Sequence, residues 1–434
     1  MKKIKISLLF LTLILIVSAC KKDDDINNPI NSWILSELRE NYYWNNTISS
    51  SESAPADHDS EGYFYSITGR NGKDKWSYIT DDFEGMMAEI QGEPLSMGYE
   101  LVADFRFSGS SELGIYITHV FQNTPASEAG LKRGDVIVKI NDYALTRSNV
   151  ENLFYQNSYK ATLSDGRSVE LTARTIETDP MVYRTVFNEG GKTIGYMVYM
   201  SFTSGKEDKF LASLDNAAKY FNQNNIDNLI VDFRYNGGGD INSALHLASL
   251  IAPKSAIEQN KVLIKYNLNS NLQALYPASE LVDTLKNISN NLDLEHVHFI
   301  ITKSSASASE LLVSGLKPYM KVTTIGAPSH GKYAGMHPIQ HPISSWGMLP
   351  ITFTYTNANG EDVEGGIPVD VGAAENALTG LYPFGDTRDP MLSAAIRNIA
   401  GTLAKIKVYE KDVDLPSAGI NLAKTRVPGW YKLD

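Results

Sequence analysis

The sequence predicts a multidomain α/β protein whose largest part is an α/β core with a mainly parallel sheet. A chain of 434 residues is long enough for two or three domains. In its second half, continuous apolar segments that suit buried strands, such as 229–234 and 297–302, alternate with segments of helical spacing. Strands that alternate with helices indicate βαβ units and a parallel sheet. The first half differs, because a helical segment there is followed by several short strands.

Composition and charge limit the classes of function. The apolar fraction of 43% and the charged fraction of 21% are typical of a soluble globular protein. The formal net charge of −11 argues against nucleic acid as a partner. Cys20 is the only cysteine, which excludes an intramolecular disulfide and any cysteine metal site. No metal and no cofactor is expected.

The first thirty residues have the pattern of an export signal followed by a polar tether. A basic start leads into the apolar stretch 7–17, which is too short to span a bilayer in the usual way. Small residues directly before Cys20 resemble the bacterial lipobox, in which the cysteine is lipidated and becomes the new N-terminus. Loss of residues 1–19 would remove three lysines and no acidic residue, so that the charge changes from −11 to −14. Residues 20–30 would then be the tether.

The lipobox resemblance implies a protein of the cell envelope that a lipid anchors to the membrane. Lys21 rather than an aspartate follows Cys20, which in lipoproteins of this kind suggests the outer membrane, on either its periplasmic or its external face. The alternative is a signal peptide that ends near a cysteine by coincidence.

Residues 31–87 are predicted to form a small, aromatic-rich helical domain. Trp33, Ile34 and Leu38 recur at helical spacing. The segment contains no constellation of catalytic side chains, so its aromatic residues are expected to pack rather than bind a ligand.

Residues 88–179 change to short strands and contain a long, specific motif. From Pro125 to Ile137 the order is P-A-x-x-A-G-L-x-x-G-D-x-I, which predicts a short helix stopped by a glycine, a tight turn and a strand. This order resembles a PDZ domain.

The PDZ resemblance implies a site for an extended peptide that adds to the edge of a sheet. The backbone N–H groups of Met97, Gly98 and Tyr99 would accept the terminal carboxylate of the peptide. A helix near residues 148–155 would complete the groove. Val150 and Leu153 either line this groove or belong to the core under the helix.

Residues 180–400 are predicted to form the α/β core, and residues 401–434 a C-terminal tail without a usable motif. Within the core, strand 229–234 leads into a glycine loop that contains Gly237 and Gly238. A phosphate site is disfavoured because the loop has neither the GK[ST] nor the GxGxxG pattern. Such a loop can instead present backbone N–H groups to an anion.

A second turn in the core carries a row of serines, residues 304–309, between an apolar strand and a helix. Ser307 and Glu310 have the spacing of a helix capping box, which is the plain structural interpretation. A serine at the start of a helix also lies beside unpaired N–H groups and the positive end of the helix dipole. Ser307 is therefore also a candidate nucleophile.

Chain geometry places Lys332 near Ser307. A helix of about eleven residues carries the chain roughly 16 Å away, and a returning strand of about six residues brings it back roughly 20 Å. The glycine loop ends a neighbouring strand, at the edge of a parallel sheet where active sites form. A serine needs a base within hydrogen-bond reach, and a buried, neutral lysine can be that base. The N–H groups of Ala308 and of Gly237 or Gly238 could hold an oxyanion.

Four features together resemble the carboxy-terminal processing peptidases, the Ser/Lys proteases of family S41. They are the S-A-S-A-S-E turn, the G-K pair 25 residues past its middle serine, the D-x-R-x-N-G-G loop and the upstream PDZ domain. The resemblance implies that Ser307 is the nucleophile and Lys332 the base. It also implies oxyanion donors at Gly237 or Gly238 and at Ala308. The expected activity is cleavage of unfolded or carboxy-terminal protein segments, with the PDZ domain binding the substrate peptide.

Two positions depart from the pattern of that family. Many members carry a glutamine four residues past the lysine, where this sequence has Met336, and some carry an acid eleven residues past the serine, where it has Pro318. What holds the amine of Lys332 is therefore open. The alternative function is a catalytically weak or inactive PDZ lipoprotein that acts as a peptide-binding adaptor. A glycan-cleaving protein is disfavoured because no convincing pair of carboxylates is present.

Overall fold

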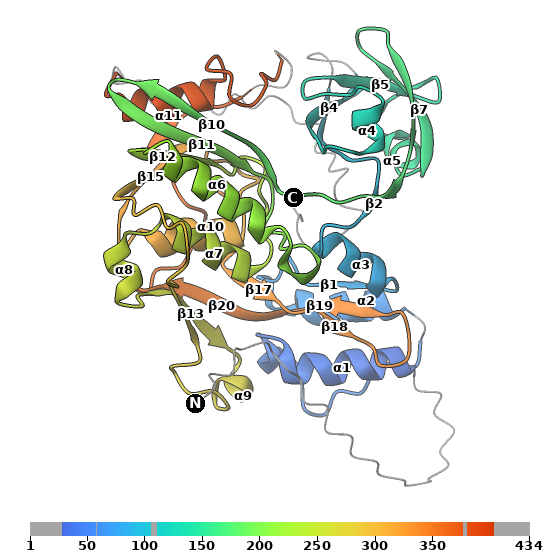
Figure 1. Ribbon diagram of the computed structural model, residues 1–434. Coiled ribbons are helices and arrows are strands. Elements are labelled where there is room, and N and C mark those ends of the chain that lie inside the picture. Colours follow the sequence, from blue (N-terminus) through green and yellow to red (C-terminus); the bar gives the residue numbers. More distant parts are fainter. Residues whose placement is uncertain (1–27, 58, 106–110, 376–379, 403–434) are drawn as a thin grey trace.

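The computed structural model describes residues 28–57, 59–105, 111–375 and 380–402. The predicted signal peptide with Cys20, most of the tether and most of the C-terminal tail lie outside these residues. Within them, no helix has the length and apolar character needed to cross a membrane. The chain forms an N-terminal helical part, a PDZ-like β part and an α/β core with mixed sheets (Figure 1), as predicted.

A six-stranded sheet forms the centre of the core, in the order β10-β11-β12-β15-β16-β21. Only the β10–β11 hairpin is antiparallel, and every other described pairing in this sheet is parallel. The mainly parallel sheet is therefore confirmed. Its strands are β10 (Met181–Glu189), β11 (Lys192–Tyr199), β12 (Asn228–Asp232), β15 (His296–Ile301), β16 (Lys321–Gly326) and β21 (Val371–Gly372).

Helices cover both faces of this sheet because its central strands are apolar on both sides. On one face lie α6 (Leu211–Gln223), α7 (Ile241–Ile251) and α10 (Ala308–Leu316), and on the other lies α11 (Pro390–Ile399). The small helix α8 (Lys254–Glu258) packs against the same core as α7. Strands β12 and β15 each end at the edge where the glycine loop and the serine turn begin, as the sequence predicts.

A second, antiparallel sheet packs against the far side of α10 and has the order β14-β13-β20-β17. Its strands are β13 (Val262–Leu268), β14 (Val282–Thr284), β17 (Ala334–Met336) and β20 (Ile351–Asn357), and α9 (Ser270–Gln273) follows β13. Helix α10 is thus enclosed between two sheets, which explains why all nine of its residues are buried.

The PDZ-like part is built around the sheet order β3-β4-β5-β7-β8. Strand β3 pairs only with β4 among the described residues, so it forms an edge of this sheet. The main elements are β3 (Tyr99–Phe105), β4 (Leu113–Val120), α4 (Pro125–Glu128), β5 (Val136–Ile140), α5 (Val150–Phe154), β7 (Ser158–Leu163) and β8 (Ser168–Thr172). The short strands β2 (Leu95–Ser96) and β9 (Arg174–Thr175) pair with each other where the chain enters and leaves, and β6 (Tyr143–Ala144) pairs with β5.

The N-terminal part is completed by strands from late in the chain. It contains α1 (Pro29–Asn41), α2 (Ser60–Thr68), β1 (Tyr78–Thr80) and α3 (Phe83–Ile90). Strand β1 pairs with β19 (Gly347–Leu349), which pairs with β18 (Ile339–Gln340). Its apolar core likewise includes Ala334, Met348 and Ile351. The N-terminal helices are therefore packed directly on the segment that follows Lys332.

Candidate active site

Ser307 stands at the start of α10 in a backbone conformation that few serines adopt. Its φ of 55° and ψ of −116° lie in a region that is costly for a residue with a Cβ atom. The sharp bend at Ser307 turns the chain from the loop after β15 into the helix, beside the N–H groups of the first helical turn. Backbone strain of this kind concentrates at functional sites.

The serines on either side of Ser307 serve the structure of the turn. Ser305 is buried and donates its hydroxyl to the carbonyl of Phe233 at 2.7 Å. Ser309 is buried and donates to the carbonyl of Asn236 at 2.9 Å. These two hydrogen bonds attach the serine turn to the neighbouring glycine loop. Ser307 is more exposed than either of them, so its hydroxyl is the one of the three that a substrate can reach.

The glycine loop lies in close contact with the serine turn. A Cβ atom on Gly238 would come within 2.8 Å of the Ala306 carbonyl oxygen and of the Ser307 Cβ atom. The φ of +104° at this position also disfavours any other residue. The Gly238 N–H already donates to Asn236 Oδ1 at 2.9 Å, so Gly238 provides close approach rather than an oxyanion donor. The oxyanion role predicted for Gly237 and for Ala308 stays a prediction.

Lys332 lies in the loop between β16 and β17 and is only 1% exposed. Burial disfavours the charged ammonium and lowers the pKa of Lys332 to about 8, while the carboxylates of Asp74 and Glu310 oppose this change. A lysine with this pKa is neutral in a useful fraction of molecules near neutral pH. It therefore meets the requirement for a general base.

Two buried side chains connect the backbones of Ser307 and Lys332, which are 25 positions apart. Glu310 Oε2 accepts hydrogen bonds from the Ser307 N–H at 2.9 Å and from the Lys332 N–H at 2.8 Å. The hydroxyl of Tyr355 lies 3.1 Å from the Ser307 carbonyl oxygen and 3.0 Å from that of Lys332. The structure therefore brings these two predicted residues together, and it does so through contacts to both N–H groups and both carbonyls.

Glu310 accepts two further hydrogen bonds at its other carboxylate oxygen. These come from the Gly331 N–H at 2.6 Å and the Ser329 hydroxyl at 2.5 Å. Burial raises the pKa of Glu310, and the four donors oppose this shift. The capping interaction was predictable from the Ser307-x-x-Glu310 spacing, whereas the partners at 329–332 depend on the tertiary fold.

His330, close to Lys332, is held as a neutral ring. Its Nε2 atom lies 3.3 Å from the indole Nε1 of Trp76, which can only donate. Burial, followed by the charges of Lys303 and Lys332, lowers the pKa of His330 to about 4. A ring that accepts the indole proton and resists protonation is poorly suited to be the base for Ser307.

Met336 does not take the place of the glutamine expected from the family pattern. It lies in β17 and packs with apolar residues of the N-terminal part and of α3. Pro318 follows the end of α10 and supplies no charge. Two carboxylates, those of Asp74 and Glu310, raise the pKa of Lys332 against the effect of burial. Asp74 is a residue that sequence reasoning missed.

The loop that precedes Gly237 is fixed by a buried ionic network that the sequence did not reveal. Arg234 is 1% exposed and binds the carboxylates of Asp232, Asp389 and Glu375 at 2.7 to 2.9 Å. Asp389 also caps α11. Arg133 of the PDZ-like part contacts Glu375 at 2.7 Å and the Tyr235 hydroxyl at 2.9 Å. The D-x-R motif thus joins the glycine loop, α11 and the PDZ-like part.

The structure corrects one residue of the predicted peptide groove, and the groove itself stays a prediction. Val150 is completely buried in the core of the PDZ-like part, because α5 turns this residue toward the sheet, so it does not line a groove. Leu153 is half-buried at the same helix. Gly98 has a φ of +89° and lies against Thr124, and its N–H donates to Ser96 Oγ at 3.1 Å. Met97 is buried and Tyr99 half-buried at the start of the edge strand β3.

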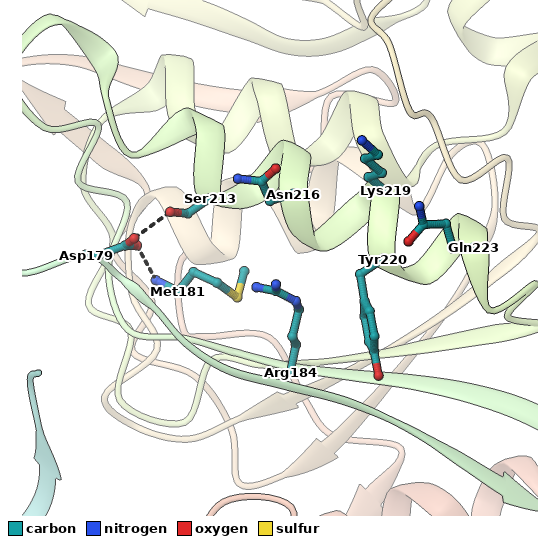
Figure 2. A pocket seen from close by; sticks show the side chains of 8 residues that line it. All are labelled: Asp179, Met181, Arg184, Ser213, Asn216, Lys219, Tyr220 and Gln223. Carbon is teal, nitrogen blue, oxygen red and sulfur yellow. Dashed lines mark hydrogen bonds between the residues drawn. The ribbon is translucent and has the colours of Figure 1, made fainter.

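A hollow of about 330 Å³ lies between β10 and α6 (Figure 2). Arg184 and Lys219 contribute its cationic groups, and the carboxylate of Asp179 accepts from Ser213 and from the Met181 N–H. None of the residues described above at the Ser307 turn lines it.

Comparison with known families matches three segments of the chain. Residues 29–78 match the peptidase S41 N-terminal domain, residues 96–169 match a PDZ domain, and residues 193–373 match peptidase family S41. The last segment contains the glycine loop, the serine turn and the lysine.

Individual relatives are distant. A "Probable CtpA-like serine protease" of Staphylococcus saprophyticus is 22% identical over 222 residues, which are 50% of this chain and 42% of the relative. A protein of the same name from Staphylococcus epidermidis is 23% identical over 224 residues with the same coverage. The chain thus spans less than half the length of these curated relatives.

A solved structure supports the fold. The crystal structure of an S41 protease candidate from Bacteroides fragilis superposes with a TM-score of 0.72 at 22% identity, covering 89% of this chain and 100% of that one. The order of parts, the family matches and this superposition agree. The chain therefore carries segments that match peptidase family S41, the peptidase S41 N-terminal domain and a PDZ domain, and the superposition supports the fold.

Proposed function

We propose that the protein is a serine endopeptidase that cleaves unfolded or carboxy-terminal protein segments with a Ser307–Lys332 dyad. The observation that carries the proposal is the double connection of these two residues by Glu310 and Tyr355, with Lys332 buried and its pKa lowered. A serine nucleophile needs a base in fixed geometry, and shared contacts at both residues supply that geometry.

The chemistry follows from the positions of these groups. Neutral Lys332 accepts the proton of the Ser307 hydroxyl while Oγ attacks the carbonyl carbon of the scissile peptide bond. The N–H groups of Ala308 and Gly237 hold the negative oxygen of the tetrahedral intermediate. The Lys332 ammonium then gives its proton to the leaving amine, and the C–N bond breaks to leave an acyl ester on Ser307. Water, deprotonated by Lys332, hydrolyses this ester and restores the serine.

Cleavage of an unfolded protein tests the proposal. The purified wild-type protein is compared with the Ser307→Ala and Lys332→Ala variants by following the appearance of fragments. Cleavage by the wild type alone supports a Ser/Lys peptidase, and equal cleavage by all three contradicts it. Saturable binding of peptide without turnover by the wild type would instead favour the adaptor function, for which Met336 in place of glutamine is the specific observation.

Substrate binding by the PDZ domain is supported by the edge position of β3. An extended peptide can pair with such a strand and bring its carboxylate to the loop of residues 97–99, where the Gly98 N–H would have to exchange its bond to Ser96 Oγ for one to the peptide. Arg133 connects this domain to the catalytic core, because its guanidinium contacts Tyr235 two residues before Gly237. Peptide binding could therefore gate the active site through this contact.

Replacement of Arg133 by methionine is expected to lower kcat on a short peptide by roughly 3- to 30-fold, a typical range for coupling between sites. The variant removes the contacts to Glu375 and Tyr235 and leaves the Ser307 turn intact. Steady-state kinetics measure the effect. Arg167→Met is the matched control, because Arg167 pairs with Asp135 and Asp165 inside the PDZ domain. Equal kinetics of the two variants would count against gating.

Attachment to the outer membrane through a lipid on Cys20 is part of the proposal. It rests on the lipobox resemblance of the residues before Cys20. Labelled palmitate should enter the wild-type protein in its bacterial host, and a Cys20→Ala variant should lose the label and leave the membrane fraction. A variant that keeps both label and membrane association would contradict the anchor.

A further inference from the structure

Asp74 of the N-terminal domain has a carboxylate whose position is fixed by four hydrogen bonds. Oδ1 accepts from the N–H groups of Trp76 at 3.0 Å and Ser77 at 2.9 Å. Oδ2 accepts from the Tyr42 hydroxyl at 2.9 Å and the Ser77 hydroxyl at 2.5 Å. Tyr42 is completely buried, so the carboxylate is held by a rigid part of its own domain. A fixed charge of this kind can act on a neighbouring site without reorganising.

The turn that carries Asp74 is attached to the segment around Lys332. The indole N–H of Trp76 donates to His330 Nε2, and the Trp76 ring packs edge-on against Tyr333 with centroids 5.9 Å apart. His330 and Tyr333 lie on either side of Lys332 in the chain. In addition, the Ile351 N–H donates to the Ser77 hydroxyl at 2.9 Å, which joins the same turn to β20. Three contacts therefore fix the position of this turn relative to the lysine.

Two carboxylates act on the charge of the lysine amine. Asp74 and Glu310 are the carboxylates that stabilise its protonated form, with Asp74 the larger contributor. His330 remains neutral because burial lowers its pKa to about 4, and Tyr355 remains neutral because burial raises its pKa. The carboxylates of Asp74 and Glu310 each accept four hydrogen bonds, so each charge is fixed in position and partly compensated.

We propose that Asp74 is a positioning residue of the Ser307–Lys332 site. It orders the turn whose Trp76 and Ser77 contact His330, Tyr333 and β20, and it brings a negative charge of the N-terminal domain into the neighbourhood of Lys332. The inference rests on the proposed function for its catalytic meaning. It bears on the question that Met336 raises, because it gives the N-terminal domain a role in holding the segment around the lysine. It also makes the N-terminal domain a part of the active site rather than an accessory.

Competitive acetylation of lysines tests this proposal without relying on turnover. The full-length Ser307→Ala protein is treated with acetic anhydride over a range of pH, and the labelling of Lys332 is followed by mass spectrometry relative to the exposed Lys192. Asp74→Asn in this background should move the midpoint of Lys332 labelling down by about one pH unit, because an opposite charge is lost. Glu61→Gln, which removes an exposed carboxylate of the same domain, should leave it unchanged.

The variants separate a positioning role from a structural one. Asp74→Glu restores the charge and should return the midpoint toward that of the parent protein. If Asp74→Asn fails to fold, Tyr42→Phe serves instead: it removes a donor from the carboxylate, strengthens its effective charge and should move the midpoint up. A midpoint that is unchanged in Asp74→Asn, or in Tyr42→Phe where that variant is used, overturns the proposal.

The same substitution can be followed in active protein. When Ser307 is retained, Asp74→Asn should shift the acidic limb of the pH profile of kcat/KM. A shift in labelling without any turnover would refute the peptidase function and keep the inference.

Discussion

Ser307→Ala is expected to reduce kcat/KM for peptide cleavage by at least about 10³-fold, the scale of losses when a serine nucleophile is removed. The hydroxyl of Ser307 is the only one in this turn that combines exposure with a strained backbone at a helix start. Alanine removes the attacking oxygen and leaves the N–H group that bonds Glu310. The loss should therefore appear in activity alone, with the free energy of unfolding nearly unchanged.

The flanking serines provide the matched controls for this variant. Ser305→Ala and Ser309→Ala remove the hydrogen bonds to the carbonyls of Phe233 and Asn236. Each is expected to lower the free energy of unfolding by about 1 kcal/mol while much of the cleavage activity remains. Activity that survives in Ser307→Ala and disappears in either control would place the nucleophile elsewhere.

Glu310→Ala is expected to lower the free energy of unfolding by about 3–5 kcal/mol, because it removes a buried carboxylate and leaves its hydrogen-bond donors without an acceptor. The side chain is 1% exposed and accepts four hydrogen bonds, three of them from backbone N–H groups. Cleavage should also be lost, because Glu310 fixes Ser307 relative to Lys332. Urea denaturation followed by circular dichroism measures the stability.

Two further variants serve as comparisons for the loss of stability in Glu310→Ala. Glu310→Gln keeps one acceptor oxygen and should lose less stability than the alanine variant, while its amide group opposes one set of N–H donors. Glu189→Ala removes an exposed carboxylate and should change the free energy of unfolding by no more than about 0.5 kcal/mol. If Glu310→Ala were as stable as Glu189→Ala, the network around Glu310 would not hold the site together.

The order of domains could be predicted from sequence because each has a local signal. The alternation of apolar strands and helices identifies the parallel sheet, and the motif from Pro125 identifies the PDZ domain. The packing of the N-terminal helices with β18 and β19 could not be predicted, because strands of two and three residues are too short to show an alternating pattern in the sequence. The same holds for the antiparallel sheet that encloses α10, whose strands β13 and β20 pair across almost ninety positions of chain.

The site was predictable where spacing along the chain decides the geometry. The serine turn and the return of the chain to Lys332 follow from the lengths of one helix and one strand. Asp74 and Tyr355 reach the same place from distant elements, and only the packed structure reveals them. Val150 shows that local spacing can also fail. The position of a residue on a short helix does not tell whether its side chain faces a groove or the core, and Val150 is buried in the core.

The pH dependence of kcat/KM for a short peptide tests the central claim most directly, because a base must be neutral to accept the proton of Ser307. With the pKa of Lys332 lowered to about 8 by burial, activity should be low near pH 6 and rise as the pH passes through about 8. Lys332→Met should be inactive across the whole range. A rate that is already maximal at pH 6, or a Lys332→Met variant that cleaves with the wild-type profile, would contradict a Ser307–Lys332 dyad.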